Sequence, residues 1–168
     1  MGNKILIVIL VLLFAAVGGF AWHNWQQARD IEPAVLTVLL EGQEVGTISL
    51  AEIKQLGGQE FSVILRSSGQ APREQTYTGI PLRLVLEAVQ PEILEGRESV
   101  TVTAVDGYAT TFSVDELFEN EHIYLAWAQD GQPLGDKASG GSGPLLVIPR
   151  QDEFGQRWCK FAVRVDIR

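Results

Sequence analysis

Residues 100–117, VTVTAVDGYATTFSVDEL, predict a β-hairpin followed by a short helix. The first six residues and the run after the central tyrosine are β-branched or small, which is typical of strands. Asp106-Gly107 lies between these runs and favours a two-residue type I′ turn, because both residues tolerate a positive φ. Ser113 precedes Glu116 by three residues, which is the spacing of a capping box at the start of a helix.

The rest of the chain after residue 33 repeats this mixture of strands and short helices. Ser49 and Glu52 have the same capping-box spacing, and Pro81 opens a further helical pattern because proline favours the first turn of a helix. Strand patterns cover residues 34–40, 45–48, 61–66, 122–128, 145–148 and 157–168. Strands thus outnumber helices, and we expect an α+β fold with a mixed or antiparallel sheet that curls towards a barrel.

Charge and cysteine content exclude some classes of function. The chain of 168 residues carries a formal net charge of -8 and a single cysteine. An acidic protein lacks the basic face that nucleic-acid binding needs, so nucleic acid is excluded as a partner. One cysteine cannot form an internal disulfide, so the fold must be held by packing. Residues 34–168 are long enough for one domain with its own core.

The N-terminal segment has the character of a membrane span. Residues 5–22 carry no charged side chain, and a run of about 20 apolar residues crosses a bilayer. Lys4 precedes the run and no Lys or Arg follows until Arg29, a bias that favours a cytoplasmic N-terminus. We expect a signal anchor over residues 1–25, a stalk over residues 26–33, and a single-pass protein of the cell membrane whose domain is extracytoplasmic. The alternative is a cleavable signal peptide, because small residues near the end of the run could fit a peptidase site.

Cysteine is the most reactive residue type in the predicted domain, and Cys159 is its single cysteine. The alternation of a strand over residues 157–168 places Cys159 on one apolar face with Phe161, Val163 and Val165. A free cysteine on such a face behaves as a small hydrophobic residue, so we expect Cys159 in the core, with a nucleophile or metal ligand as the alternative. No group of histidine, cysteine and carboxylate residues has metal-ligand spacing, so we expect no metal site made by the protein alone.

A glycine-rich loop is a candidate anion site. It consists of Ser139, Gly140, Gly141, Ser142 and Gly143. Consecutive glycines can direct backbone N–H groups at a phosphate, and Lys137 or Arg150 could add a positive charge. Such loops usually open a helix, whereas this one opens a strand, so a flexible connector is the alternative.

Five segments in a fixed order carry a resemblance to a known family. They are GTISLAEIKQL at 46–56, YTGIPLRLVL at 77–86, VDGY at 105–108, GPLLVIP at 143–149 and RWCK at 157–160. Together they resemble the oxidoreductase molybdopterin-binding domain, the core domain of the sulfite oxidase family, over residues 34–168. The resemblance implies a fold in which loops around a cleft hold a pterin phosphate and a metal. It also implies that Asp106, Gly107 and Tyr108 belong, with the glycine-rich loop, to the cofactor-binding region.

Two departures from the family pattern shape the functional hypotheses. Family enzymes tie molybdenum to a cysteine thiolate early in the domain, and residues 34–80 contain no cysteine. Pro144 and Leu145 continue to Leu146, where many members have an arginine suited to gripping a phosphate. We therefore expect no bound cofactor and a binding or interaction module with an envelope protein or a small molecule as its partner. The alternative is a molybdopterin-dependent oxidoreductase or a subunit of an envelope redox system.

Protease added to intact spheroplasts is expected to remove the domain, because Lys4 and the uncharged run place the residues after 25 outside the membrane. The measurement is an immunoblot of the domain before and after digestion, with a cytoplasmic protein as the control. Complete protection of the domain would contradict the predicted orientation.

Overall fold

The computed structural model describes residues 13, 18–19, 34–66, 71–119 and 122–168. The chain divides into two compact units, Met1–Pro33 and Ala34–Arg168. The predicted anchor and stalk therefore lie almost entirely outside the described residues. Among the residues that are described, no helix is long and apolar enough to cross a membrane.

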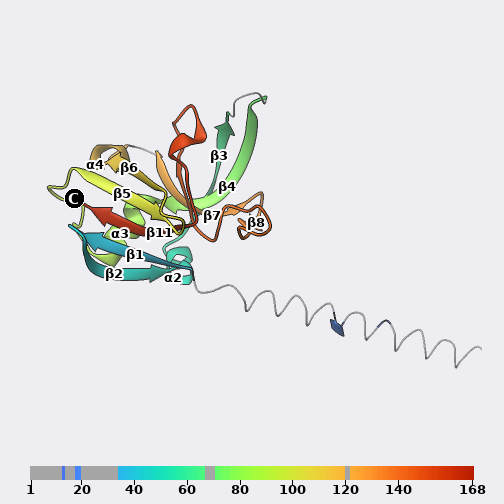
Figure 1. The fold of residues 1–168 in the computed structure, drawn as a ribbon, viewed down its shortest axis with the longest axis horizontal. Coiled ribbons are helices and arrows are strands. Elements are labelled where there is room, and N and C mark those ends of the chain that lie inside the picture. The colour runs from blue at the N-terminus through green and yellow to red at the C-terminus, as the bar shows by residue number, and fades with distance from the viewer. Residues whose placement is uncertain (1–12, 14–17, 20–33, 67–70, 120–121) are drawn as a thin grey trace, which may run out of the picture. The chain divides into compact units, whose positions relative to one another are not determined.

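The first sheet has the last strand of the chain at its centre (Figure 1). In spatial order its strands are β2 (Gln43–Ser49), β1 (Val35–Leu40), β11 (Ala162–Ile167), β5 (Ser99–Ala104) and β6 (Ala109–Ser113). β1 and β11 run parallel, with Val38 opposite Val165, and the other neighbouring pairs are antiparallel. The expected mixed pairing is confirmed.

The second sheet is antiparallel throughout. Its strands are β10 (Cys159–Lys160), β9 (Leu146–Pro149), β7 (Ile123–Gln129), β4 (Arg73–Pro81) and β3 (Gln59–Leu65), with β8 (Gln132–Pro133) paired to β7. The β3–β4 hairpin extends beyond the rest of the domain in Figure 1. The strands thus divide between two sheets, where the sequence pattern predicted one.

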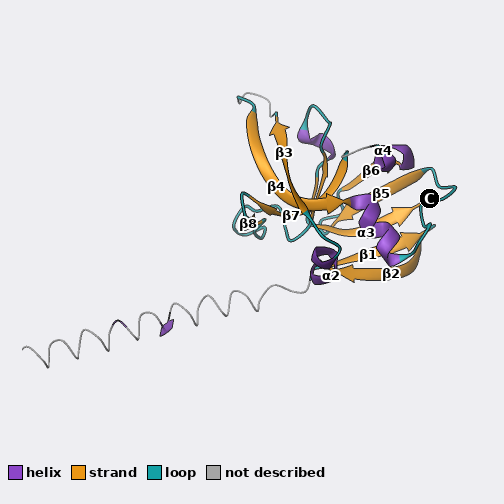
Figure 2. Ribbon diagram, turned by 180° about the vertical axis from the view of Figure 1, so that it is seen from behind, coloured by secondary structure: helices purple, strands orange, loops and turns teal. Residues whose placement is uncertain are grey.

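Four short helical elements accompany the sheets, namely α2 (Leu50–Gln55), α3 (Leu82–Val89), α4 (Val114–Phe118) and the 3-10 helix η1 (Gly155–Arg157). Both predicted capping boxes are present. The Ser49 hydroxyl accepts a hydrogen bond from the Glu52 N–H at 3.3 Å, and the Ser113 hydroxyl accepts one from the Glu116 N–H at 3.2 Å. α3 follows Pro81 as predicted, and Figure 2 shows it lying over the first sheet.

Two hydrophobic clusters hold the domain together. The larger combines the inner face of the first sheet with α3 and part of the second sheet, and includes the fully buried Val102 and Leu86. The smaller belongs mainly to the second sheet and contains Phe61, Tyr77 and Tyr124. The ring centroids of Phe61 and Tyr77 are 6.1 Å apart, which is within the range of a favourable aromatic pair, and the Tyr124 ring packs closely on the Phe61 ring.

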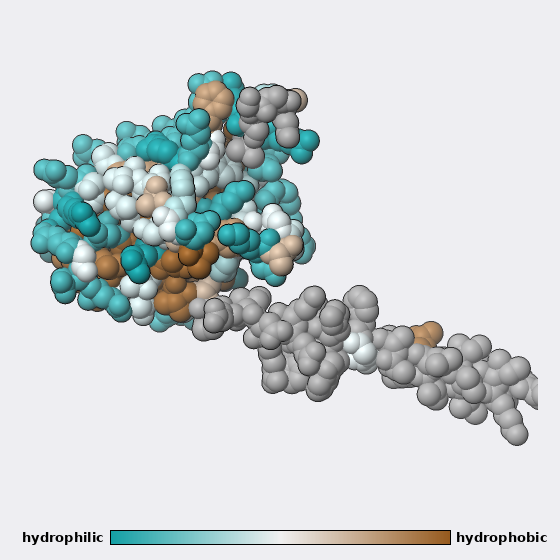
Figure 3. Space-filling view, in the orientation of Figure 1, coloured by the Kyte–Doolittle hydropathy of each residue, from teal (hydrophilic) through white to brown (hydrophobic). Residues whose placement is uncertain are grey.

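The face of the molecule seen in Figure 3 is mostly polar, with hydrophobic residues gathered in its lower half. Val35 of β1 and Val163 of β11, which are neighbouring strands, are among the exposed apolar residues of the first sheet. Each of these two side chains is 37% exposed.

The predicted type I′ turn at Asp106-Gly107 is wrong, although the hairpin itself is present. In the loop between β5 and β6 only Gly107 has a positive φ, at +85°. Its N–H donates to the Ala104 carbonyl at 3.0 Å, and the Asp106 carboxylate accepts from the Tyr108 N–H at 3.1 Å. This is the pattern of a three-residue loop in which a type I turn is followed by a glycine. Two-residue hairpins with positive φ at both positions occur instead at Glu41-Gly42 and Asp130-Gly131.

The prediction of one continuous last strand is also wrong, because the chain changes sheet at Phe161. β10 belongs to the second sheet and β11 to the first, and Phe161 between them has a φ of +56°. The alternation of faces therefore stops at this residue. Of the predicted apolar row, Cys159 and Val165 are fully buried, whereas Val163 is 37% exposed.

Replacing Gly107 by valine is expected to lower the free energy of unfolding by about 1–3 kcal/mol, because a β-branched residue at positive φ is strained. Thermal denaturation would show this as a lower Tm. Asp106→Asn is the matched control and should leave the Tm nearly unchanged, because an amide oxygen can still accept from the Tyr108 N–H. Equal Tm values for wild type and Gly107→Val would contradict the loop assignment.

Candidate functional site

A pocket of about 600 Å³ lies where β4 and β7 meet the segment between β9 and β10. Its wall combines the aromatic rings of Tyr77, Phe154 and Trp158 with the cationic side chains of Arg66 and Lys160. The remaining lining is polar, with the amide side chains of Gln75, Gln129 and Gln156 and the hydroxyl of Ser142. We call this pocket the cleft. A neighbouring pocket of about 570 Å³ shares Arg66 with it and follows β3.

The aromatic wall of the cleft is held in place by the smaller hydrophobic cluster. The rings of Tyr77 and Trp158 meet edge to face with centroids 5.8 Å apart. The Tyr77 hydroxyl donates to the Gln75 side chain at 2.9 Å. Burial, with a smaller contribution from the Asp130 carboxylate, raises the pKa of Tyr77 to about 12. Tyr77 therefore keeps its proton near neutral pH and acts as a hydrogen-bond donor, and aromatic rings in a pocket wall suit a flat ligand.

The cations of the cleft suit an anionic group. Arg66 forms an exposed ion pair with Glu153 at 3.4 Å, and such pairs contribute little to stability. A ligand anion could therefore replace Glu153 at small cost. Lys160 projects into the cleft from β10, a strand that is fixed by pairing with β9. Together these groups can bind a flat ring that carries a negative charge.

Cys159 points away from the cleft although both of its neighbours line it. Alternation along a strand directs Trp158 and Lys160 to one side and Cys159 to the other. Its side chain belongs to the larger hydrophobic cluster, with Sγ 4.0 Å from the Val102 carbonyl oxygen. Burial, assisted by the Asp106 carboxylate, raises the pKa of Cys159 to about 12. Cys159 is thus a thiol of the core and is not available as a thiolate in the cleft.

The residues described hold no group of three or more His, Cys, Asp or Glu side chains that could bind a metal ion. The chain has no second cysteine that could supply a thiolate. The cleft therefore fits the organic part of a pterin cofactor better than its metal.

The hairpin residues singled out by sequence lie beside the cleft and support its wall. The Tyr108 hydroxyl donates to the Gln156 carbonyl at 2.5 Å, which fixes the segment that carries Gln156. The Asp106 carboxylate lies 3.8 Å from the Lys137 ammonium group, so the hairpin and the glycine-rich loop meet there. Gly107 allows the turn and makes no contact with the cleft lining.

The backbone N–H groups of the glycine-rich loop are all used within the loop and the residues just before it. Ser139 donates to the Asp136 carboxylate, Gly140 to Lys137, Gly141 to Asp136, Ser142 to Leu134 and Gly143 to Gly135. The predicted role of these five donors in cradling an anion would require the loop to open. Only Ser142 of the loop lines the cleft.

Arg150 lies at the neighbouring pocket and not in the cleft. Its Nε donates to the Ser62 carbonyl at 3.2 Å, and its guanidinium group lies 5.9 Å from the centre of the Phe61 ring. Ser142 thus lines the cleft and Tyr108 supports its wall, whereas Arg150 lies at the neighbouring pocket. Their roles in cofactor binding stay predictions.

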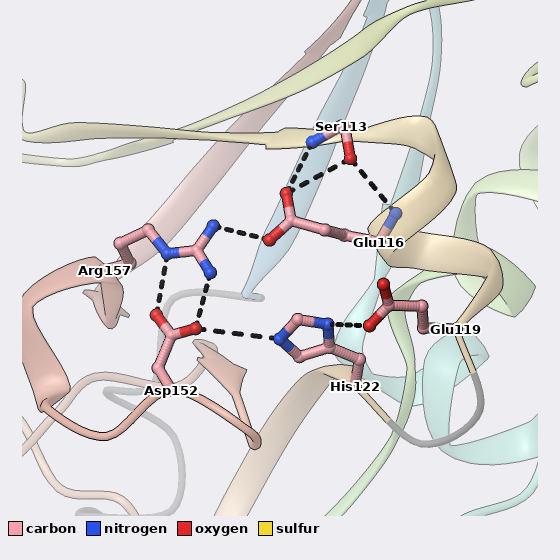
Figure 4. A network of polar contacts seen from close by, with 6 residues as sticks. All are labelled: Ser113, Glu116, Glu119, His122, Asp152 and Arg157. Atoms are coloured by element: carbon pink, nitrogen blue, oxygen red, sulfur yellow. Dashed lines mark hydrogen bonds and ion pairs between the residues drawn. The ribbon is translucent and has the colours of Figure 1, made fainter.

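Sequence reasoning missed a polar network behind the cleft (Figure 4). Arg157 donates to Glu116 at 2.7 Å and to both oxygens of Asp152 at 2.7 and 2.5 Å. Burial alone would raise the pKa of Glu116, but hydrogen bonds from the Ser113 backbone and from Arg157 outweigh it and lower the pKa below the usual value. Only the capping box of Ser113 and Glu116 was visible in the sequence, because the other contacts join residues far apart along the chain.

Two sheets with short helices and a cleft at their edge form the class of fold that the sulfite oxidase resemblance implied. The family model of the oxidoreductase molybdopterin binding domain matches residues 25–168, and the chain belongs to this family. The crystal structure of the sulfane dehydrogenase SoxCD from Paracoccus pantotrophus is similar, with a TM-score of 0.61 and 15% sequence identity. The match covers 79% of this chain and 37% of that chain, and at this identity it establishes the fold alone. No curated relative matches the chain.

A thiol reagent is expected to label Cys159 at least about 100-fold more slowly in the native protein than in the denatured protein, because reaction must wait for local opening. Labelling is followed by mass spectrometry. Ser142→Cys in a Cys159→Ser background is the control and should react fast, since Ser142 lines the cleft. Fast native labelling of the wild-type protein would show that Cys159 reaches the cleft.

Proposed function

We propose that this protein is a ligand-binding or partner-binding module held at the extracytoplasmic face of the cell membrane, and that it acts without a molybdenum centre. Membership of the molybdopterin-binding family supplies the fold and the cleft. The observation that carries the proposal is the position of Cys159 in the core.

The argument from Cys159 rests on the chemistry of the metal. Family enzymes hold molybdenum through a protein thiolate, and a thiol becomes a thiolate easily only where it is exposed or faces a positive charge. Cys159 is the single cysteine of the chain and is fully buried among apolar side chains. The Asp106 carboxylate further disfavours the thiolate. No step of a redox reaction is therefore assigned to residues of this chain.

The cleft itself is suited to binding. Arg66 and Lys160 can pair with a phosphate or a carboxylate, and charge-assisted hydrogen bonds of this kind are the stronger ones in proteins. Tyr77 and Trp158 add aromatic surface to the pocket wall, and the hydroxyl of Tyr77 stays protonated. A metal-free pterin phosphate, or another flat anion, has the required chemistry.

The membrane part of the proposal rests on the sequence. The uncharged run at residues 5–22 and the position of Lys4 favour a single span with the domain outside. An envelope protein is then a candidate partner beside a small molecule. The alternative function is a molybdopterin-dependent oxidoreductase or a subunit of an envelope redox system, and family membership is the observation that favours it.

Full-length protein purified from a host that makes the molybdenum cofactor is expected to contain substoichiometric molybdenum, because no thiolate is available to hold it. Elemental analysis gives the metal, and fluorescence of the oxidised, released pterin gives the organic part. Stoichiometric molybdenum would overturn the proposal. Loss of the molybdenum in Cys159→Ser would identify Cys159 as the ligand. Retention of the molybdenum in that variant would point to the pterin alone or to an oxygen ligand.

Binding of a pterin monophosphate tests the cleft separately. Lys160→Gln is expected to weaken binding on the order of tenfold, because one charge-assisted hydrogen bond is lost. Arg164→Gln is the matched control with the same change in charge, on an exposed position of β11 outside the cleft. Equal effects of the two substitutions in a calorimetric titration would contradict binding in the cleft.

A further inference from the structure

His122, at the start of β7, is a buried histidine that the proposed function does not use. Only 8% of its side chain is exposed. Its Nδ1 lies 2.9 Å from the Glu119 carboxylate, and its Nε2 lies 3.7 Å from the Asp152 carboxylate (Figure 4). Within the described part of the chain, Nε2 has no hydrogen-bond partner. The ring thus stands between two carboxylates from different parts of the fold.

Neither neutral form of His122 satisfies this environment. A neutral imidazole has one N–H and one lone pair, whereas an imidazolium has two N–H donors. If Nδ1 carries the proton, the lone pair of Nε2 faces Asp152; if Nε2 carries it, the lone pair of Nδ1 faces Glu119 at hydrogen-bond distance. Only the protonated ring can direct a donor at both carboxylates.

The charges around the ring favour the same state. α4 and the residue after it supply Glu116 and Glu119, and the segment between β9 and β10 supplies Asp152 and Arg157. Arg157 pairs with Glu116 and Asp152, so with a neutral histidine the Glu119 carboxylate has no cation beside it among the described residues. Arg150, whose N–H donates to the His122 carbonyl, directs its own Nε to the Ser62 carbonyl.

We propose that the protonation state of His122 controls how firmly the cleft wall is held. Asp152 begins the segment 152–158, which carries Phe154, Gln156 and Trp158 of the cleft. When His122 is protonated, its positive ring attracts the Asp152 carboxylate across 3.7 Å, in addition to the two hydrogen bonds from Arg157. When the ring is neutral, this attraction is lost. The segment is therefore held more firmly by a protonated ring than by a neutral one.

A looser wall exposes the cleft and changes its affinity for a ligand. This consequence rests on the proposed binding function, whereas the switch in the wall itself does not.

Hydrogen exchange of the full-length protein, measured without any ligand, tests the switch. Peptides covering residues 152–158 are compared at about pH 5.5 and about pH 8, after correction for the intrinsic pH dependence of exchange. Protection is expected to be on the order of tenfold greater at the lower pH, since attraction between the protonated ring and the Asp152 carboxylate is gained. Equal protection, or greater protection at the higher pH, would overturn the proposal. Because no ligand is present, the result is independent of the binding and metal tests.

Two variants assign the effect to the right histidine. His122→Gln cannot titrate and is expected to show the same protection at both pH values. His23→Gln removes the only other histidine and should keep the wild-type difference. If His122→Gln fails to fold, Glu119→Gln replaces it and is expected to reduce the difference, since one of the two carboxylates loses its charge. The proposal would also be overturned if the folded variant, His122→Gln or Glu119→Gln, kept the full wild-type difference in protection between the two pH values.

Discussion

The first sheet and the cleft both depend on the passage of the chain between sheets at Phe161. A bulky residue at a φ of +56° is strained by about 1–3 kcal/mol and persists only where its surroundings hold it. The Phe161 N–H donates to the Ser142 carbonyl at 2.9 Å, and its carbonyl accepts from the Val105 N–H at 3.0 Å. One residue thus ties the glycine-rich loop to the hairpin. Gly143 packs so closely on Phe161 that an added Cβ would lie 2.4 Å from its ring, which is why glycine occupies that position.

The change of sheet at Phe161 also determines which side chains at β10 point to the cleft and which point to the core. The strand ends the second sheet next to β9, and its alternation sends Trp158 and Lys160 to the cleft and Cys159 to the core. A cation at the cleft favours binding of an anion, and a buried thiol stays protonated. The same two-residue strand therefore carries a cation of the cleft, Lys160, and the single cysteine of the chain, which lies in the core.

The network around Arg157 holds the opposite end of the cleft wall. The guanidinium group binds Asp152 through two hydrogen bonds and Glu116 through a third, so the segment after β9 is fastened to α4. Glu116 has a lowered pKa, so its contribution to stability is present at neutral pH and is lost as the pH falls through its folded-state pKa. His122, the residue before β7, joins this network, with Nδ1 2.9 Å from the Glu119 carboxylate and Nε2 3.7 Å from the Asp152 carboxylate.

Some features were determined by the sequence alone, because the interactions that make them span only a few residues. Both capping boxes, the helix after Pro81 and the β5–β6 hairpin belong to this group. The burial of Cys159 was also predicted, from the apolar row of its strand, although its core contacts are with distant residues. The division into two sheets, the break at Phe161 and the form of the turn at Gly107 came only from the tertiary structure. So did the meeting of His122 with Asp152. These features depend on which distant strands pair, and pairing is set by packing across the whole domain, which local patterns of polarity do not record.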